Sequence, residues 1–219
     1  YEALDALDRD DPEAMCEVLG DVLMQAAFHA QIETERGRFT MADVVDGVSK
    51  KLIYRHPHVF GDVQVSDSAE VLTNWDALKR KEKGQTSTAD AIEAVPHTLP
   101  ALWRAEKTAH KAAKAGFRWD SALGALGKLE EEIRELREAV EAGGPADAPH
   151  SIQEELGDVF FIAASLAWMS GVDPEESLHL ACDKFCRRFR RVEAQGSLDG
   201  CTEAELVARW QAAKHENPS

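Results

Sequence analysis

The feature of this sequence that most constrains its fold is an internal repeat, in which the second half of the chain repeats motifs of the first. Residues 17–22 (EVLGDV) resemble residues 154–159 (EELGDV). Three further short matches keep the same order along the chain, and all four have offsets between 133 and 137 residues. Matches in register indicate duplication of one structural unit. The further matches pair residues 1–2 with 134–135, 51–55 with 184–188 and 75–79 with 210–214.

Helix start and stop signals divide both halves of the chain into helices. Asp11-Pro12 and Asp173-Pro174 each combine an N-cap with a proline at the first helical position, and apolar residues follow at helical spacing. We find no alternating pattern typical of a strand. The sequence therefore predicts an all-α fold of two tandem helical repeats. The expected helices cover about 12–37, 40–54, 68–83, 101–116, 122–142 and 151–171, and two more begin at Pro174 and after Thr202.

A polar stretch of small residues, 84–88, separates the two repeats and is typical of a linker. We expect an N-terminal repeat at 1–83, a linker at 84–100 and a C-terminal repeat at 101–219. Tyr1 stands inside a helical pattern, so we expect the first repeat to lack its start. Each repeat is expected to form a unit of the four-helix-bundle type.

The formal net charge of −15 disfavours binding to nucleic acid polymers and to anionic membranes. No apolar run has the length of a membrane span, and we expect no signal peptide. The four cysteines form no CxxC pair. Cys182 and Cys186 lie one helical turn apart, which predicts buried thiols in a reducing compartment. We therefore expect a cytoplasmic protein with neither membrane nor nucleic acid partners.

Four acidic residues of the second repeat form two pairs with helical spacing. Glu132 and Glu135 share one face of a helix, and Glu155 and Asp158 share a face of the next. If the helices pack antiparallel, the pairs meet, and two carboxylates 4 Å apart repel by about 4 kcal/mol at an effective dielectric of 20. Carboxylate oxygens suit Mg²⁺ or Mn²⁺. The alternative, a solvated acidic helix face, has similar weight on this pattern alone.

The acidic pattern resembles a known family signature. Residues 131–135 (EEIRE) followed by 155–158 (ELGD) resemble the EExxE…ExxD signature of the MazG-type nucleoside triphosphate pyrophosphohydrolases, members of an all-α pyrophosphatase superfamily. The resemblance covers nearly the whole chain and includes 55–60, 99–102 and 116–119. It implies a Mg²⁺-dependent homodimer, with Mn²⁺ as a substitute, which hydrolyses an NTP or dNTP to the monophosphate and diphosphate.

The resemblance also implies roles for individual residues. Metal-bound water attacks the triphosphate, a carboxylate orients or deprotonates that water, and basic residues stabilise the leaving pyrophosphate. Asp183 stands where the family often has asparagine, which leaves its role open. The expected metal ligands are Glu132, Glu135, Glu155 and Asp158; the catalytic residues are Glu131, Glu132 and Glu155; the substrate-binding residues are Lys128, Glu154, Lys184, Arg187, Arg188 and Trp210.

The first repeat lacks part of the acidic signature. Val18 stands at the position that matches Glu155, so we expect Glu2 and Asp21 not to form a working metal site. Two other functions remain open for the chain. One is a catalytically inactive helical module that binds a nucleotide or a regulatory partner. The other is a di-iron carboxylate protein, for which residues 176–179 (ESLH) supply only half of the usual motif.

Overall fold

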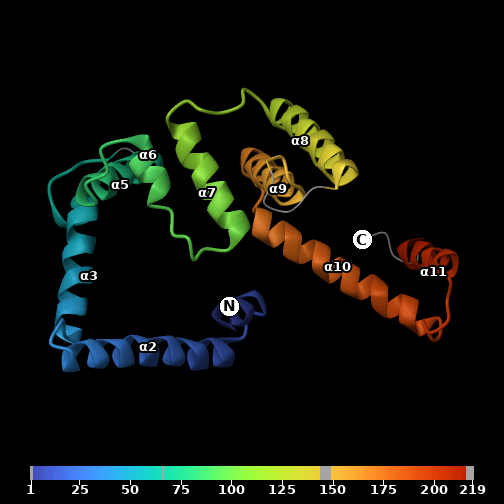
Figure 1. The fold of residues 1–219 in the computed structure, drawn as a ribbon. Coiled ribbons are helices and arrows are strands. Elements are labelled where there is room, and N and C mark those ends of the chain that lie inside the picture. Colours follow the sequence, from blue (N-terminus) through green and yellow to red (C-terminus); the bar gives the residue numbers. More distant parts are fainter. Residues whose placement is uncertain (1, 66, 144–148, 216–219) are drawn as a thin grey trace. The chain divides into compact units, whose positions relative to one another are not determined.

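The computed structural model describes residues 2–65, 67–143 and 149–215, and all regular structure in these ranges is α-helical. This confirms the all-α fold class. The chain divides into two compact units, Tyr1–Gln85 and Thr86–Ser219. Figure 1 shows the order of the helices along the chain.

Helix caps define the elements of the first unit. The Asp11 side chain accepts the backbone N–H of Ala14 at 3.0 Å, and Thr40 forms a capping box with Asp43. Helix α2 packs against α1 and α3, and α3 packs against α4 and α5. The helices are α1 (Glu2–Asp8), α2 (Pro12–Glu35), α3 (Met41–Arg55), α4 (Pro57–Phe60) and α5 (Ser68–Glu82).

Few side chains of the first unit are buried. In the 24 residues of α2, the buried residue is Ala30, and six large apolar side chains on different sides of this helix are exposed. An exposed apolar surface of this extent is typical of a protein interaction site. The exposed apolar residues of α2 are Leu19, Val22, Leu23, Met24, Phe28 and Ile32.

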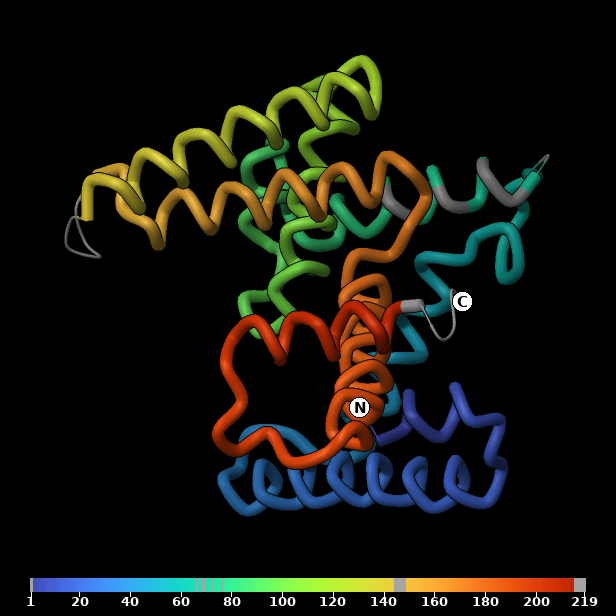
Figure 2. Tube along the Cα trace, turned by 90° about the vertical axis from the view of Figure 1, so that its right-hand side faces the viewer, coloured from blue at the N-terminus to red at the C-terminus, as the bar shows by residue number. Residues whose placement is uncertain are grey.

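The second unit is built around an antiparallel pair, α8 and α9, which lie side by side in Figure 2. Helix α7 packs on the other side of α9, and α10 forms a hairpin with α11. Small side chains at these contacts, including the buried Ala125 and Ala164, allow the helix backbones to approach closely. The helices are α6 (Thr88–Glu93), α7 (Ala101–Lys114), α8 (Ala122–Ala142), α9 (Ile152–Met169), α10 (Pro174–Ala194) and α11 (Glu203–His215).

Two features of the structure differ from the sequence predictions. The 84–100 segment, expected to be a linker, contains α6, which begins at a capping box between Ser87 and Asp90 and packs on α7. The expected buried thiols are a wrong prediction, because Cys182 and Cys186 are both exposed. Their spacing does place them on one helix, but no other described element covers that part of α10.

A helix must be long and apolar to cross a membrane. Within the described ranges, no single helix is both long enough and apolar enough to do so. The pair α9 and α10 reaches the required length and composition only when taken together, and the chain bends by 106° between them.

Candidate active site

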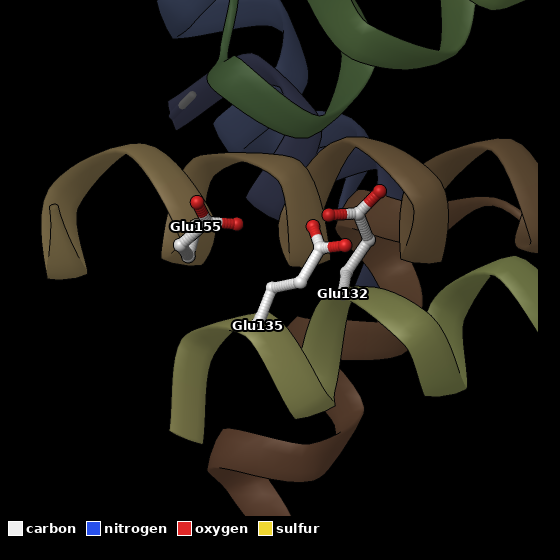
Figure 3. Close-up of side chains that lie close together, drawn as sticks. All are labelled: Glu132, Glu135 and Glu155. Carbon is white, nitrogen blue, oxygen red and sulfur yellow. The ribbon is translucent and has the colours of Figure 1, made fainter. Parts of the chain in front are cut away.

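Helices α8 and α9 bring together three carboxylates, which we call the acidic cluster: Glu132 and Glu135 from α8, and Glu155 from α9 (Figure 3). One oxygen from each side chain lies within 4.8 Å of the others. Glu132 is only 5% exposed and Glu155 only 2%. Buried carboxylates cost free energy unless a cation or hydrogen-bond donors compensate them. The cluster therefore has the form of a cation site.

The charges of the cluster act on neighbouring acids. Burial raises the pKa of Glu135, and the negative charge of Glu132 raises it further. Asp158 is not one of the three converging residues, but its pKa is also raised, first by desolvation and then by the charges of Glu132 and Glu155. Both pKa values are thus raised first by burial and then by the negative charge of nearby carboxylates. An all-oxygen donor set of this kind fits a hard divalent cation such as Mg²⁺ or Mn²⁺.

Lys128 supplies a positive charge at one edge of the acidic cluster. Its Nζ lies 2.9 Å from Glu131 Oε1 and 2.8 Å from Glu132 Oε1. The two hydrogen bonds raise the pKa of Lys128, and the bond from Lys128 lowers the pKa of Glu131. Glu131 is thus held in its ionised form beside the cluster. Its side chain is 44% exposed, and it faces solvent more than Glu132 does.

The N-terminus of α9 positions the third carboxylate. Ser151 is the N-cap of this helix and accepts the backbone N–H of Glu154 at 3.3 Å. The Glu154 side chain, expected to bind substrate, accepts the backbone N–H of His150 at 2.8 Å. Since Glu155 follows directly, this capping arrangement fixes the direction in which its side chain leaves the helix.

His150 belongs to the site and was missed by the sequence analysis. Its Nδ1 lies 3.0 Å from Glu155 Oε1, and this hydrogen bond is the main cause that raises the pKa of His150. A histidine directly before the Ser-x-x-Glu cap of an acid-bearing helix was the available signal. Helical spacing could not relate this histidine to the acidic residues, because His150 lies outside the helix.

The expected phosphate- and base-binding residues lie on α10 and α11. Within the described residues, no ion pair or hydrogen bond links Lys184, Arg187 or Arg188 to the acidic cluster. Trp210 packs against Phe185, with 5.1 Å between the ring centroids. Both rings line an apolar cavity of about 310 Å³ between α10 and α11. Of these residues, Trp210 therefore belongs to the contact between α10 and α11.

The fold and the site together define a class: a helical protein whose acidic helix pair is built to hold divalent cations. Within this class, a family model described as the MazG nucleotide pyrophosphohydrolase domain matches residues 1–60 and 121–192. The second match contains the whole acidic cluster. The chain belongs to the MazG family.

Relatives of known name resemble the chain over almost its whole length. The nucleoside triphosphate pyrophosphohydrolase/pyrophosphatase MazG of Thermotoga maritima is 38% identical over 219 residues, which covers 98% of this chain and 81% of that protein. The nucleoside triphosphate pyrophosphohydrolase of Escherichia coli K12 is 38% identical, with 99% and 83% covered. The protein of the same name from Mycobacterium tuberculosis is 39% identical, with 99% and 60% covered.

Proposed function

We propose that this protein hydrolyses nucleoside triphosphates, ribo or deoxy, to the monophosphate and pyrophosphate, and that the reaction depends on Mg²⁺, with Mn²⁺ as a substitute. The observation that carries the proposal is the convergence of Glu132, Glu135 and Glu155, whose oxygens lie within 4.8 Å of one another. Support also comes from the names of the relatives in Thermotoga maritima and Escherichia coli.

The acidic cluster and Asp158 would hold the cation. A bound divalent ion neutralises phosphate charge and lowers the pKa of a coordinated water. In the reaction the oxygen of water forms a bond to phosphorus, the bond from that phosphorus to the bridging oxygen breaks, and pyrophosphate separates from the monophosphate. The proton of the water passes to a carboxylate. Glu131 is suited to accept it, because Lys128 keeps Glu131 ionised and its side chain is accessible.

The basic residues of α10 would act on the charged parts of the substrate. Lys184, Arg187 and Arg188 would stabilise the charge on the leaving pyrophosphate, since guanidinium and ammonium groups form strong hydrogen bonds with phosphate oxygens. Trp210 would contact the base, and its position beside an apolar cavity supports that role. These assignments rest on the family likeness, and the closing of α10 and α11 toward the carboxylates is part of the proposal.

We assign the catalysis to the C-terminal repeat, residues 101–219, and a packing role to the N-terminal repeat, residues 1–83. Val18 lacks a ligand oxygen at the position that matches Glu155. The segment between the repeats, residues 84–100, then connects two related units with different tasks. The free thiols of the chain fit a reducing cytoplasm as the place where it works.

We also propose that the protein is a homodimer. Apolar side chains of α2, including Leu23 and Phe28, are exposed in the single chain, and a second copy would cover part of them with a surface of the same kind. Sedimentation equilibrium should give twice the mass of the chain. A monomer at micromolar concentration would contradict this part of the proposal.

The decisive experiment is to incubate NTPs and dNTPs with the protein and Mg²⁺, with and without chelator, and to separate the products by chromatography. We expect monophosphate and pyrophosphate, with no orthophosphate, and no reaction with chelator. Glu155→Gln should abolish the reaction. Glu141→Gln, which changes an exposed glutamate near the end of α8, is the matched control and should keep it. Nucleotide binding without turnover would instead support a non-catalytic nucleotide-binding module.

A further inference from the structure

His150 stands at an unusual place in the backbone, directly before the N-cap of α9. Its φ of 57° lies in the left-handed region, which is uncommon for residues other than glycine, although asparagine, aspartate and histidine occur there more often than most. The backbone N–H of His150 is held by the Glu154 carboxylate at 2.8 Å. The capping contacts thus fix a conformation that turns the imidazole back toward the first turn of the helix.

The imidazole meets the most buried carboxylate of the acidic cluster. Nδ1 of His150 lies 3.0 Å from Oε1 of Glu155, and Glu155 is 2% exposed. An ionised carboxylate can only accept, so Nδ1 carries the proton. This bond engages one oxygen of Glu155, Oε1. The same imidazole, with Glu135 and Glu155, lines a pocket of about 260 Å³ beside the cluster.

We propose that His150 is a positioning residue for the divalent-cation site: it fixes the orientation of Glu155 by holding Oε1 through Nδ1. The inference rests on the proposed function for its biological meaning. It adds to that function a residue from outside the acidic signature. Hydrogen bonds from neighbouring groups commonly orient metal-binding side chains, and their loss costs roughly 10- to 100-fold in metal affinity.

The test measures the affinity of the full chain for Mn²⁺ alone in four variants. Electron paramagnetic resonance detects the free Mn²⁺ in each titration. His150→Asn keeps a donor at the place of Nδ1 and tolerates the left-handed backbone, so it should bind Mn²⁺ like the wild type. His150→Gly also tolerates that backbone but removes the donor, and its affinity should fall by roughly 10-fold. His150→Gln places its amide at the position of Nε2 and should bind as weakly as the glycine variant. His97→Asn changes an exposed histidine elsewhere and should have no effect.

Two results would overturn the inference. Wild-type affinity in His150→Gly would show that the imidazole does not matter, and rescue by His150→Gln but not by His150→Asn would show that it acts through Nε2. If the glycine variant does not fold, the Asn and Gln variants still decide between these cases. In the assay of hydrolysis, His150→Gly should need more Mg²⁺ for half-maximal rate, with kcat at saturating Mg²⁺ little changed.

The outcome separates this inference from the proposed function. A wild-type protein that hydrolyses no NTP would contradict the function, and the Mn²⁺ affinities would still report on the contact between His150 and Glu155. Hydrolysis with equal Mn²⁺ affinity in all variants would leave the function standing and remove the role of His150.

Discussion

The indole N–H of Trp103 in α7 donates to both carboxylate oxygens of Asp173, at 3.0 and 2.9 Å, although 70 residues separate the two in the chain. The same carboxylate accepts the backbone N–H groups of Glu175 and Glu176, the second and third residues of α10. One side chain therefore caps α10 and attaches it to α7. The direction in which α10 leaves the core of the second unit depends on this junction.

Replacing Asp173 with alanine should destabilise the second unit. Loss of an N-cap costs about 0.5–2 kcal/mol, and an indole N–H left without its partner adds about 1–3 kcal/mol when it is buried. Since Trp103 is only partly buried, we expect a total loss near the lower end, about 2 kcal/mol. Urea unfolding monitored by circular dichroism measures the change.

Two variants serve as controls for this prediction. Trp103→Phe removes the indole donor but keeps the cap, and it should cost less than Asp173→Ala. Asp120→Ala changes an exposed acid before α8 and should leave the free energy of unfolding almost unchanged. Equal stability of Asp173→Ala and the wild type would show that the junction does not hold α10.

The same carboxylate predicts a dependence of stability on pH. Backbone N–H groups at the start of α10 and the Trp103 indole lower the pKa of Asp173. A group with a lowered pKa stabilises the fold above its unfolded pKa, about 3.9 for aspartate, and this contribution is lost as the pH falls through the folded value. The wild type should therefore have a higher free energy of unfolding than Asp173→Asn. This difference should be largest at about pH 6 and should shrink below about pH 4. Urea unfolding at several pH values checks this, and a constant difference would contradict it.

Lys128 should substitute in part for a metal ion when none is bound. Its ammonium contacts Glu131 and Glu132, so Lys128→Gln removes the cation that is bonded to both carboxylates. We expect Lys128→Gln to have a lower Tm than the wild type when no metal is present. Adding Mg²⁺ should raise its Tm by more than it raises that of the wild type, because an ion that binds only the folded state stabilises it. Arg137→Gln, which removes an exposed cation from the same helix, is the control. An equal Mg²⁺-dependent rise in both variants would contradict the prediction.

Glu131 should act on the chemical step and not on metal binding. It does not belong to the three converging carboxylates, but it lies ionised beside them. If it accepts the proton of the attacking water, Glu131→Gln should lower kcat by roughly 10²- to 10⁴-fold with little change in Mn²⁺ affinity. The neighbouring exposed glutamate provides the control, Glu130→Gln, whose kcat should match the wild type. Loss of Mn²⁺ binding in Glu131→Gln would place Glu131 among the ligands instead.

The helical fold could be predicted from local signals because caps and prolines fix helix starts. Thr40 and Ser151 stand where the structure places N-caps, and the helix predicted at 122–142 has the same bounds as α8. The start of α6 was missed although Ser87 and Asp90 form a capping box there, because the surrounding residues are small and polar. The exposure of Cys182 could not be predicted, since spacing fixes a face of a helix but not what covers it.

The candidate site, like the fold, could be predicted from the sequence only in part. The helical spacing of Glu132 and Glu135 predicts a shared face, and the structure brings Glu155 to it from the adjacent helix. The hydrogen bond from His150 to Glu155 depends on a left-handed residue outside any helix, which helical periodicity does not register. The roles of the predicted metal, catalytic and substrate-binding residues stay predictions until the variants are measured.

All three carboxylates of the acidic cluster come from one helical hairpin, α8 with α9. The carboxylates of the acidic cluster are therefore encoded in one short stretch of the gene, between the codons of Glu132 and Glu155. Natural selection can remove or restore the chemistry there by a few base changes, while the alanine contacts that join the helices stay as they are. A hairpin of this kind is also small enough to be grafted onto a designed helical scaffold, where its ion binding can be studied apart from any substrate.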